Sequence, residues 1–229
     1  PDLFGCGDSE GDFGQASWAV WKQDVRYLVQ WATDQGARQI TLWGLRAGTL
    51  LALDLYQDVT LTIHRLLLWQ PVHNGEQLMT QFLRLRMAAG MMSGEAETVA
   101  QLRERLYAGE TIEVAGYDVS PALVKQLDLI NLKRFTLPAD SNIDWFEVVN
   151  QAGKPLLPVS RKLIDELHTQ GLDIRAATAE GEPFWATQEL SSAPLLIEST
   201  TAAVSEVSHF LSAPVVSPVR AKNHPEEPF

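Results

Sequence analysis

The sequence predicts an α/β protein built on a parallel sheet with helices on both faces. Short apolar segments typical of strands alternate with helical segments along most of the chain. One expected strand, at 64–69 (HRLLLW), is almost continuously apolar, as in strands that are covered on both faces. Another, at 39–43, runs into a Gly-x-x-x-Gly turn that leads directly into an apolar helix. These three observations together predict the fold class.

Length and composition bound the possibilities further. The chain has 229 residues, of which 45% are hydrophobic and 21% charged, which suits one globular domain with a sizeable core. Its formal net charge of -11 opposes binding to nucleic acid or to anionic membranes. No apolar run approaches the roughly 20 residues that a membrane-spanning helix needs. The single cysteine, Cys6, cannot form an internal disulfide. We therefore expect a soluble, cytoplasmic protein.

The elements are expected in a regular order. Ser17 is a candidate N-cap for a helix that runs to Gln35, with Gly36 just past its end. The other core elements expected are strands at 39–43, 64–69, 143–149 and 172–179 and helices at 49–56, 158–170 and 200–211.

Three regions follow from this order. Residues 1–74 and 133–211 are expected to form the sheet-containing core. Residues 75–132 are expected to form an inserted helical cap without a strong strand, with helices at 77–92 and 95–107. Residues 212–229 are rich in proline and polar residues and are expected to be a disordered tail.

The turn Gly44-Leu45-Arg46-Ala47-Gly48 carries the strongest local signal. Strand, tight glycine turn and helix together resemble a nucleophile elbow, in which the central side chain projects above the sheet and the next residue offers its N–H to an oxyanion. The central residue here is Arg46, which stays protonated and cannot act as the nucleophile. Beside the N–H groups of Ala47 and Gly48 it can bind a carboxylate or phosphate. Structural pairing of Arg46 with a nearby carboxylate is the open alternative.

A second motif precedes the turn by one helix. Residues 2–9 read Asp-Leu-Phe-Gly-Cys-Gly-Asp-Ser, and this loop followed by the elbow resembles the α/β-hydrolase superfamily. The segments DLFGCGDSEGDFG, LWGLRAGTLLA, LLLWQPVHNGEQLMTQFLRLRMAA, EVAGYDVSP and GEPFWATQE are similar to the group called exosortase A system-associated hydrolase 2, found with exosortase and exopolysaccharide genes in bacteria with PEP-CTERM proteins. The resemblance implies an α/β-hydrolase fold with a cap. It also implies that the first strands of that fold lie before residue 1.

The resemblance also shows where a catalytic triad should be. The acid should follow the strand at 143–149, but residues 150–154 read NQAGK. The histidine should follow the strand at 172–179, but residues 180–185 read EGEPFW. A Ser-His-Asp relay needs all three groups within hydrogen-bond reach. None can be assembled, so the sequence leaves open whether the protein is an enzyme.

A few other side chains are weaker candidates. His73 follows an apolar strand and is placed to act as a base or a ligand contact, and Cys6 is a possible nucleophile. Glu180 and Glu182 share the loop that should hold the histidine, where a carboxylate could face Arg46. The neighbouring Phe184-Trp185 pair is expected to pack the last helix. No metal-ligand spacing is present, and no cofactor is expected.

Three functional hypotheses follow. The first, implied by the resemblance, is a hydrolase of acyl esters or thioesters with a degenerate triad, linked to exosortase and exopolysaccharide systems. The second is a non-catalytic module in which Arg46 binds a small anionic or acyl ligand, or a partner. The third is a functionless fragment whose strand at 39–43 exposes a sheet edge.

Overall fold

The architecture comes from a computed structural model that describes residues 1–93, 97–139, 141–187 and 191–212. Residues 213–229, which make up most of the expected tail, lie outside the described residues. Within the described ranges, no helix is both long and apolar enough to cross a bilayer.

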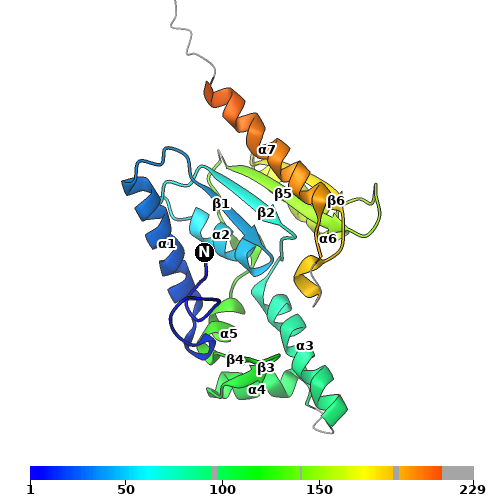
Figure 1. Cartoon of the computed structure of the whole chain (residues 1–229). Coiled ribbons are helices and arrows are strands. Elements are labelled where there is room, and N and C mark those ends of the chain that lie inside the picture. The colour runs from blue at the N-terminus through cyan, green and yellow to red at the C-terminus, as the bar shows by residue number, and fades with distance from the viewer. Residues whose placement is uncertain (94–96, 140, 188–190, 213–229) are drawn as a thin grey trace, which may run out of the picture.

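A four-stranded parallel sheet lies at the centre of the molecule, in the order β1-β2-β5-β6 (Figure 1). The strands are β1 (Thr41–Leu45), β2 (Arg65–Trp69), β5 (Asn142–Val149) and β6 (Asp173–Glu180). The register places Gly44 opposite Leu68, and Leu68 opposite Trp145. All four expected strands are therefore present, and the predicted α/β class is confirmed.

Helices join these strands and cover both faces of the sheet. The α-helices are α1 (Trp18–Asp34), α2 (Ala47–Tyr56), α3 (Gly75–Ser93), α4 (Val99–Ala108), α5 (Pro121–Leu127), α6 (Pro158–Thr169) and α7 (Pro194–Ser212). Short 3-10 helices occur at η1 (Phe13–Gln15), η2 (Leu132–Arg134) and η3 (Phe184–Ala186).

Side chains of β2 alternate between two hydrophobic clusters, one on each face of the sheet. Leu66 and Leu68 belong to the main core, which also includes residues of α1, α2 and α6. Leu67 and Trp69 point the other way, into a smaller cluster with Leu196 of α7. Successive residues of a strand face opposite sides of a sheet, so every residue of β2 is buried. This explains the continuous apolar run in the sequence.

Helix α1 forms as its sequence predicts. The Ser17 side chain accepts a hydrogen bond from the Val20 N–H at 3.2 Å, which satisfies one free donor of the first turn. Trp18 and Trp21 are buried on one side of the helix. Gly36, with φ of 88°, follows the C-cap residue in the left-handed conformation that favours glycine.

Several expected boundaries were wrong. Helix α4 begins at Val99 rather than at residue 95, directly after its N-cap residue Thr98. Strand β1 begins at Thr41 rather than at residue 39, because the N–H of Ile40 donates to the imidazole of His64 (3.1 Å) instead of to a strand. Helix α7 begins at Pro194 rather than at residue 200, and proline is well suited to the first position of a helix because its fixed φ is already helical.

The cap was expected to hold no strong strand, and the structure adds a short hairpin there. Strands β3 (Ile112–Val114) and β4 (Tyr117–Val119) form an antiparallel hairpin between α4 and α5. The turn residues Ala115 and Gly116 both have positive φ, 52° and 86°. Such turns match the twist of paired strands. Ile112 and Val119 of the hairpin belong to the same buried cluster as the sheet, so packing is continuous from the cap to the core.

Candidate functional site

The elbow lies between β1 and α2 and has the backbone strain expected of such a turn. Arg46 has φ of 52° and ψ of -112°, a region that residues with a Cβ rarely adopt. A Cβ on Gly44 would lie 2.4 Å from the carbonyl oxygen of Gly48, so the strand and the helix meet too closely for any side chain there. A Cβ on Gly48 meets nothing within 4 Å. Gly44 is therefore the glycine that the turn requires.

Backbone hydrogen bonds hold the elbow in place. The N–H of Arg46 donates to the carbonyl of Trp69 on β2 (3.1 Å). The carbonyl of Arg46 accepts from both the N–H and the hydroxyl of Thr49, at 3.0 and 2.6 Å. Ala47 and Gly48 begin α2, where N–H groups have no acceptor within the helix. These donors and the positive end of the helix dipole lie next to Arg46.

The Arg46 side chain contacts two neutral groups. Its Nη2 donates to Gln81 Oε1 of α3 at 2.9 Å, and its Cζ lies 6.0 Å from the centre of the Trp185 ring of η3. Burial lowers the pKa of Arg46, although a guanidinium still stays charged. Among the residues that the structure describes, no carboxylate lies within ion-pair distance of Arg46.

Two cavities meet at this arginine. The larger, of about 860 Å³, lies between the elbow, α3, the tip of the β3–β4 hairpin and η3. Its walls are mostly apolar and include Leu78, Phe82 and Leu85. The smaller, of about 120 Å³, is lined by Gln and Asn side chains and by His73. Arg46 and Gln81 line both cavities. The site thus has a charged group between a small cavity of mixed polar and apolar lining and a larger, mostly apolar one.

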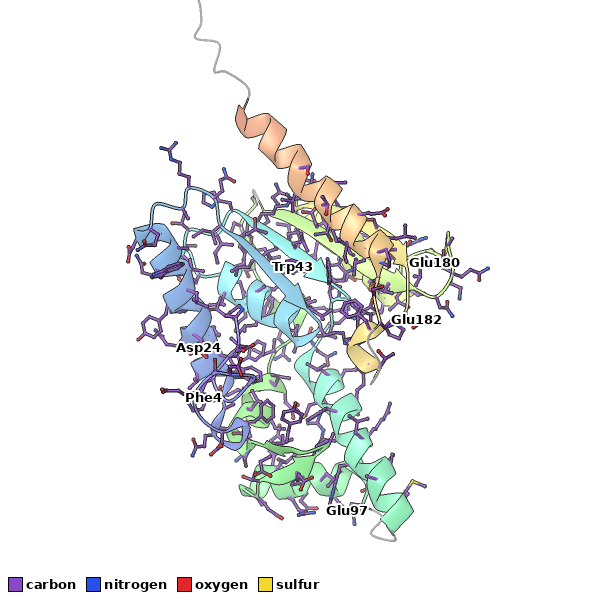
Figure 2. All side chains as sticks on the ribbon, viewed as in Figure 1. Phe4, Asp24, Trp43, Glu97, Glu180 and Glu182 are labelled. Atoms are coloured by element: carbon purple, nitrogen blue, oxygen red, sulfur yellow. The ribbon has the colours of Figure 1, made fainter. Side chains whose placement is uncertain are left out.

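The Glu180–Glu182 loop does not face Arg46. Both carboxylates are exposed, and Glu182 accepts a hydrogen bond from the Ser191 hydroxyl at 3.2 Å. Figure 2 shows both side chains at the end of β6, beside the start of α7. The expected pair between this loop and Arg46 is not formed, because Trp185 from the same loop occupies the space over the guanidinium.

His73 lies in the loop after β2 and is half-buried, whereas a loop histidine is more often exposed. Its Nε2 lies 3.2 Å from the hydroxyl of Ser160, a fully buried residue of α6. Its ring is 6.0 Å from that of Trp145. Burial lowers the pKa of His73, and the negative charge of Glu147 acts in the opposite direction. The sequence identified His73 as a candidate, but it gave no sign that Ser160 and Glu147 lie near it.

Residues of the N-terminal motif form hydrogen bonds with one another and so stabilise their own loop. The Asp2 carboxylate accepts from the Asp8 N–H at 3.1 Å, and the Ser9 hydroxyl donates to the Asp2 carbonyl at 2.8 Å. A Cβ on Gly7 would clash with the Asp2 carboxylate. Burial and the nearby Asp2 raise the pKa of Cys6, which favours the thiol over the nucleophilic thiolate. This opposes the interpretation of Cys6 as a nucleophile.

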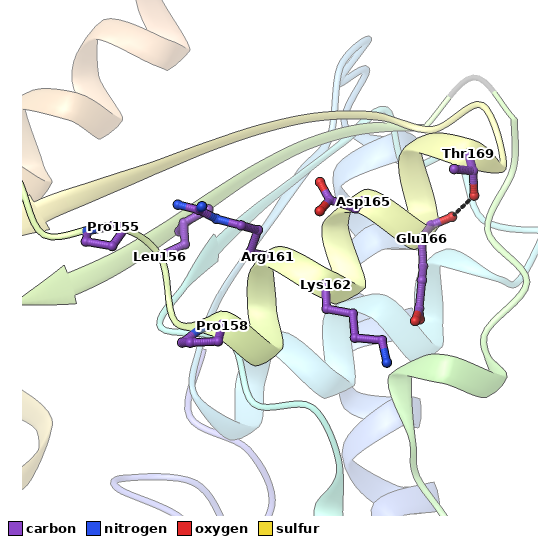
Figure 3. A pocket seen from close by; sticks show the side chains of 8 residues that line it. All are labelled: Pro155, Leu156, Pro158, Arg161, Lys162, Asp165, Glu166 and Thr169. Atoms are coloured by element: carbon purple, nitrogen blue, oxygen red, sulfur yellow. Dashed lines mark hydrogen bonds between the residues drawn. The ribbon is translucent and has the colours of Figure 1, made fainter.

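A third cavity lies along α6, away from the elbow (Figure 3). It is lined by Arg161 and Lys162 as well as by Asp165 and Glu166, so its wall carries two charges of each sign. Such a surface does not favour a ligand of either charge. Among the described residues, no cluster of three or more His, Cys, Asp or Glu side chains could hold a metal ion.

Solved structures show what kind of fold this is. Alpha/beta hydrolase domain-containing protein 10 from mouse is 16% identical with a TM-score of 0.56, over 92% of this chain and 77% of that one. Est1E from Butyrivibrio proteoclasticus, solved with ferulic acid bound, is 16% identical with a TM-score of 0.54, over 91% and 74%. A carboxyl esterase from Bacillus coagulans is 11% identical with a TM-score of 0.53, over 86% and 73%. The chain has the α/β-hydrolase fold. No family model and no curated protein sequence matches it.

Sequence reasoning missed the residues that complete the site. Gln81 lies on α3, among the apolar residues Leu78, Phe82 and Leu85 at helical spacing, but that spacing does not show which face meets the elbow. Trp185 was expected to pack the last helix. Only its neighbour Phe184 does so, in the cluster with α7, while Trp185 covers Arg46.

Proposed function

We propose that this protein is a non-catalytic member of the α/β-hydrolase fold that binds the carboxylate of an acyl ligand at Arg46. The observation that carries the proposal is the position of Arg46. It stands at the nucleophile position of the elbow, contacts a neutral amide and an aromatic ring, and lines both a small cavity with several polar side chains and a larger, mostly apolar one. A cation in that position attracts an anion, and the cavities determine what the anion is attached to.

The head of the ligand would be held by charge and by N–H donors. A guanidinium presents paired donors that match the two oxygens of a carboxylate. The N–H groups of Ala47 and Gly48 in the first turn of α2 are further donors on the same turn. Gln81 can rotate its amide and donate to the carboxylate while Arg46 turns toward it.

The tail of the ligand would lie in the larger cavity. Leu78, Phe82 and Leu85 form one apolar face of α3 there, and Trp185 covers the opposite side. Burying an apolar chain contributes about 25 cal/mol for each Å² removed from water. Medium-chain fatty acids and aromatic acids fit this combination of a charged end and an apolar wall.

Calorimetric titration with octanoate tests this proposal. Arg46→Met should weaken binding at least about tenfold, because a charged hydrogen bond of about 1.5 to 3 kcal/mol is lost. Arg46→Lys should weaken it less, since it keeps the charge but not the paired donors. The matched control is Arg84→Met, which removes an exposed arginine from α3 and changes the net charge equally. Equal octanoate affinity in Arg46→Met and the wild type would contradict the proposal.

A second candidate function is hydrolysis of an acyl ester or thioester. The hydrogen-bond distance of 3.2 Å between His73 Nε2 and the Ser160 hydroxyl favours it, because a serine next to a histidine is the basis of nucleophilic catalysis. The full burial of Ser160 opposes it. Measuring the turnover of short and long acyl esters and thioesters tests whether the protein is a hydrolase. Turnover that is lost in Ser160→Ala would support hydrolysis, and absence of turnover by the folded protein would exclude these substrates.

We also propose that the protein belongs to the exosortase A system-associated group and acts in the bacterial cytoplasm. The five sequence segments that resemble this group support the proposal. The test is the gene neighbourhood. Adjacent exosortase, PEP-CTERM or exopolysaccharide genes are expected, and a neighbourhood without them would count against the assignment.

A further inference from the structure

The small cavity behind Arg46 contains one group that can gain a charge near neutral pH. His73 lines its wall together with Gln70, Asn74 and Gln77, and none of the residues that line it carries a carboxylate. The amides are neutral at every usable pH. Among the protein groups on this wall, only the imidazole can therefore take up a proton when an anion enters.

Ser160 holds the imidazole in a way that suits both of its charge states. A serine hydroxyl can donate to a neutral ring nitrogen or accept from a protonated one. The 3.2 Å contact between the Ser160 hydroxyl and Nε2 can thus persist when His73 gains a proton. The ring also packs near Trp145, with 32° between the two planes. Nδ1 is the ring nitrogen that Ser160 does not contact.

The charges around His73 come from three elements. Glu147 of β5 is fully buried and raises the pKa of His73, whereas Lys133 of η2 lowers it. Arg46 lines the same cavity from the elbow. Burial is the largest influence and keeps the pKa of His73 below its ordinary value, so the ring is neutral at neutral pH while the site is empty. An anion placed between His73 and Arg46 would raise the pKa of His73 and so favour the protonated imidazole.

We propose that His73 is a second contact for the ligand head group held by Arg46, and that binding of the carboxylate is coupled to uptake of one proton by His73. This inference rests on the proposed function of Arg46. It adds a regulatory property to that function, namely that the protein holds its ligand more tightly in a mildly acidic medium.

The direction of the pH dependence follows from the two states of the site. The pKa of His73 is low in the free protein and rises when the anion binds. Affinity therefore increases as the pH falls through the bound-state pKa, and it levels off below the free-state pKa. A nearby opposite charge shifts a pKa by about one unit or more, so octanoate should bind about fivefold to tenfold more tightly at about pH 5.5 than at about pH 8.

Calorimetric titration of the wild-type protein with octanoate tests this coupling. Octanoate stays mainly ionised over this range, so its own titration contributes little. Repeating the titrations in buffers of different ionisation enthalpy measures proton uptake directly. His73→Gln should abolish both the pH dependence and the proton uptake while keeping the binding that Arg46 provides. The matched control is His168→Gln, which removes a histidine near the C-terminal end of α6 and should leave the coupling intact. The His168 ring contacts the Ile174 carbonyl of β6 at 3.0 Å.

Four outcomes separate the possibilities. Tighter binding at low pH with proton uptake that is lost only in His73→Gln supports the inference. Octanoate binding with a flat pH profile overturns the inference but leaves the role of Arg46 standing. Persistence of the coupling in His73→Gln also overturns it. Absence of octanoate binding at every pH overturns both proposals. Should His73→Gln fail to fold, the His73 imidazole can be titrated by NMR in the wild type, where an unchanged pKa on adding octanoate would contradict the coupling.

Discussion

At the scale of single residues, Arg46 combines backbone strain with the binding role proposed for its side chain. Its backbone adopts φ of 52°, a conformation that glycine tolerates far better than arginine. The strain directs the side chain above the sheet, toward Gln81 and Trp185. A non-glycine residue that keeps such a strained backbone conformation is typical of a functional site.

The pair Arg46→Gly and Arg46→Ala tests this strain. Both variants remove the contacts of the side chain, but only glycine relieves the conformation. We expect Arg46→Gly to be more stable than Arg46→Ala by about 1 kcal/mol or more in urea unfolding. Equal stability of the two variants would mean that the elbow is not strained.

At the same scale, the sequence could predict positions but not partners. The Gly-x-x-x-Gly spacing is local, so Arg46 and Gly44 could be placed at the turn from the sequence alone. Gln81 and Trp185 are brought to Arg46 from elements 35 and 139 positions further along the chain. Which face of α3 meets the elbow depends on the packing of the whole cap, and no local pattern encodes it.

At the scale of elements, the elbow requires close contact between β1 and α2. The two glycines of the turn look equivalent in sequence, but only Gly44 is pressed against backbone. Gly48 lies within α2, in ordinary helical surroundings. The helices with clear caps, such as α1, could be predicted closely. The β3–β4 hairpin could not, because its strands have three residues each and its turn carries alanine at a position that favours glycine or asparagine.

Alanine substitutions at the two glycines should therefore differ. Gly44→Ala is expected to destabilise the protein by about 2 kcal/mol or more, because the Cβ meets backbone that cannot move away. Gly48→Ala should be neutral or stabilising by up to about 1 kcal/mol, because alanine favours a helix. Thermal or urea unfolding measures both. Similar losses in the two variants would contradict the packing of the elbow described above.

At the scale of the whole molecule, the sheet is well covered on its faces, and its described part ends in two edge strands, β1 and β6. Among the described residues, β1 has a hydrogen-bonded neighbour only on the β2 side. Trp43 on this strand is 59% exposed and contacts Trp69, with 4.6 Å between ring centroids. An exposed edge strand with an aromatic side chain favours association between molecules. The net charge of -11 opposes it.

We expect this chain to associate in a concentration-dependent way through β1, and Trp43→Lys to reduce that association. A charged side chain on an edge strand discourages pairing with another strand. The control is Leu129→Lys, which introduces the same charge at a residue that is 70% exposed elsewhere on the surface. Sedimentation velocity or light scattering over a range of concentrations distinguishes them. An equal effect of the two substitutions would show that net charge, rather than the edge, controls association.

The central claim is that the elbow binds a carboxylate where other elbows hold a nucleophile. A crystal structure with a fatty acid brominated at its far end tests it most directly, because anomalous scattering locates the bromine. We predict that the carboxylate lies on the Arg46 guanidinium and the bromine among Leu78, Phe82 and Leu85. A ligand bound with its carboxylate away from Arg46, or with its tail outside this cavity, would contradict it.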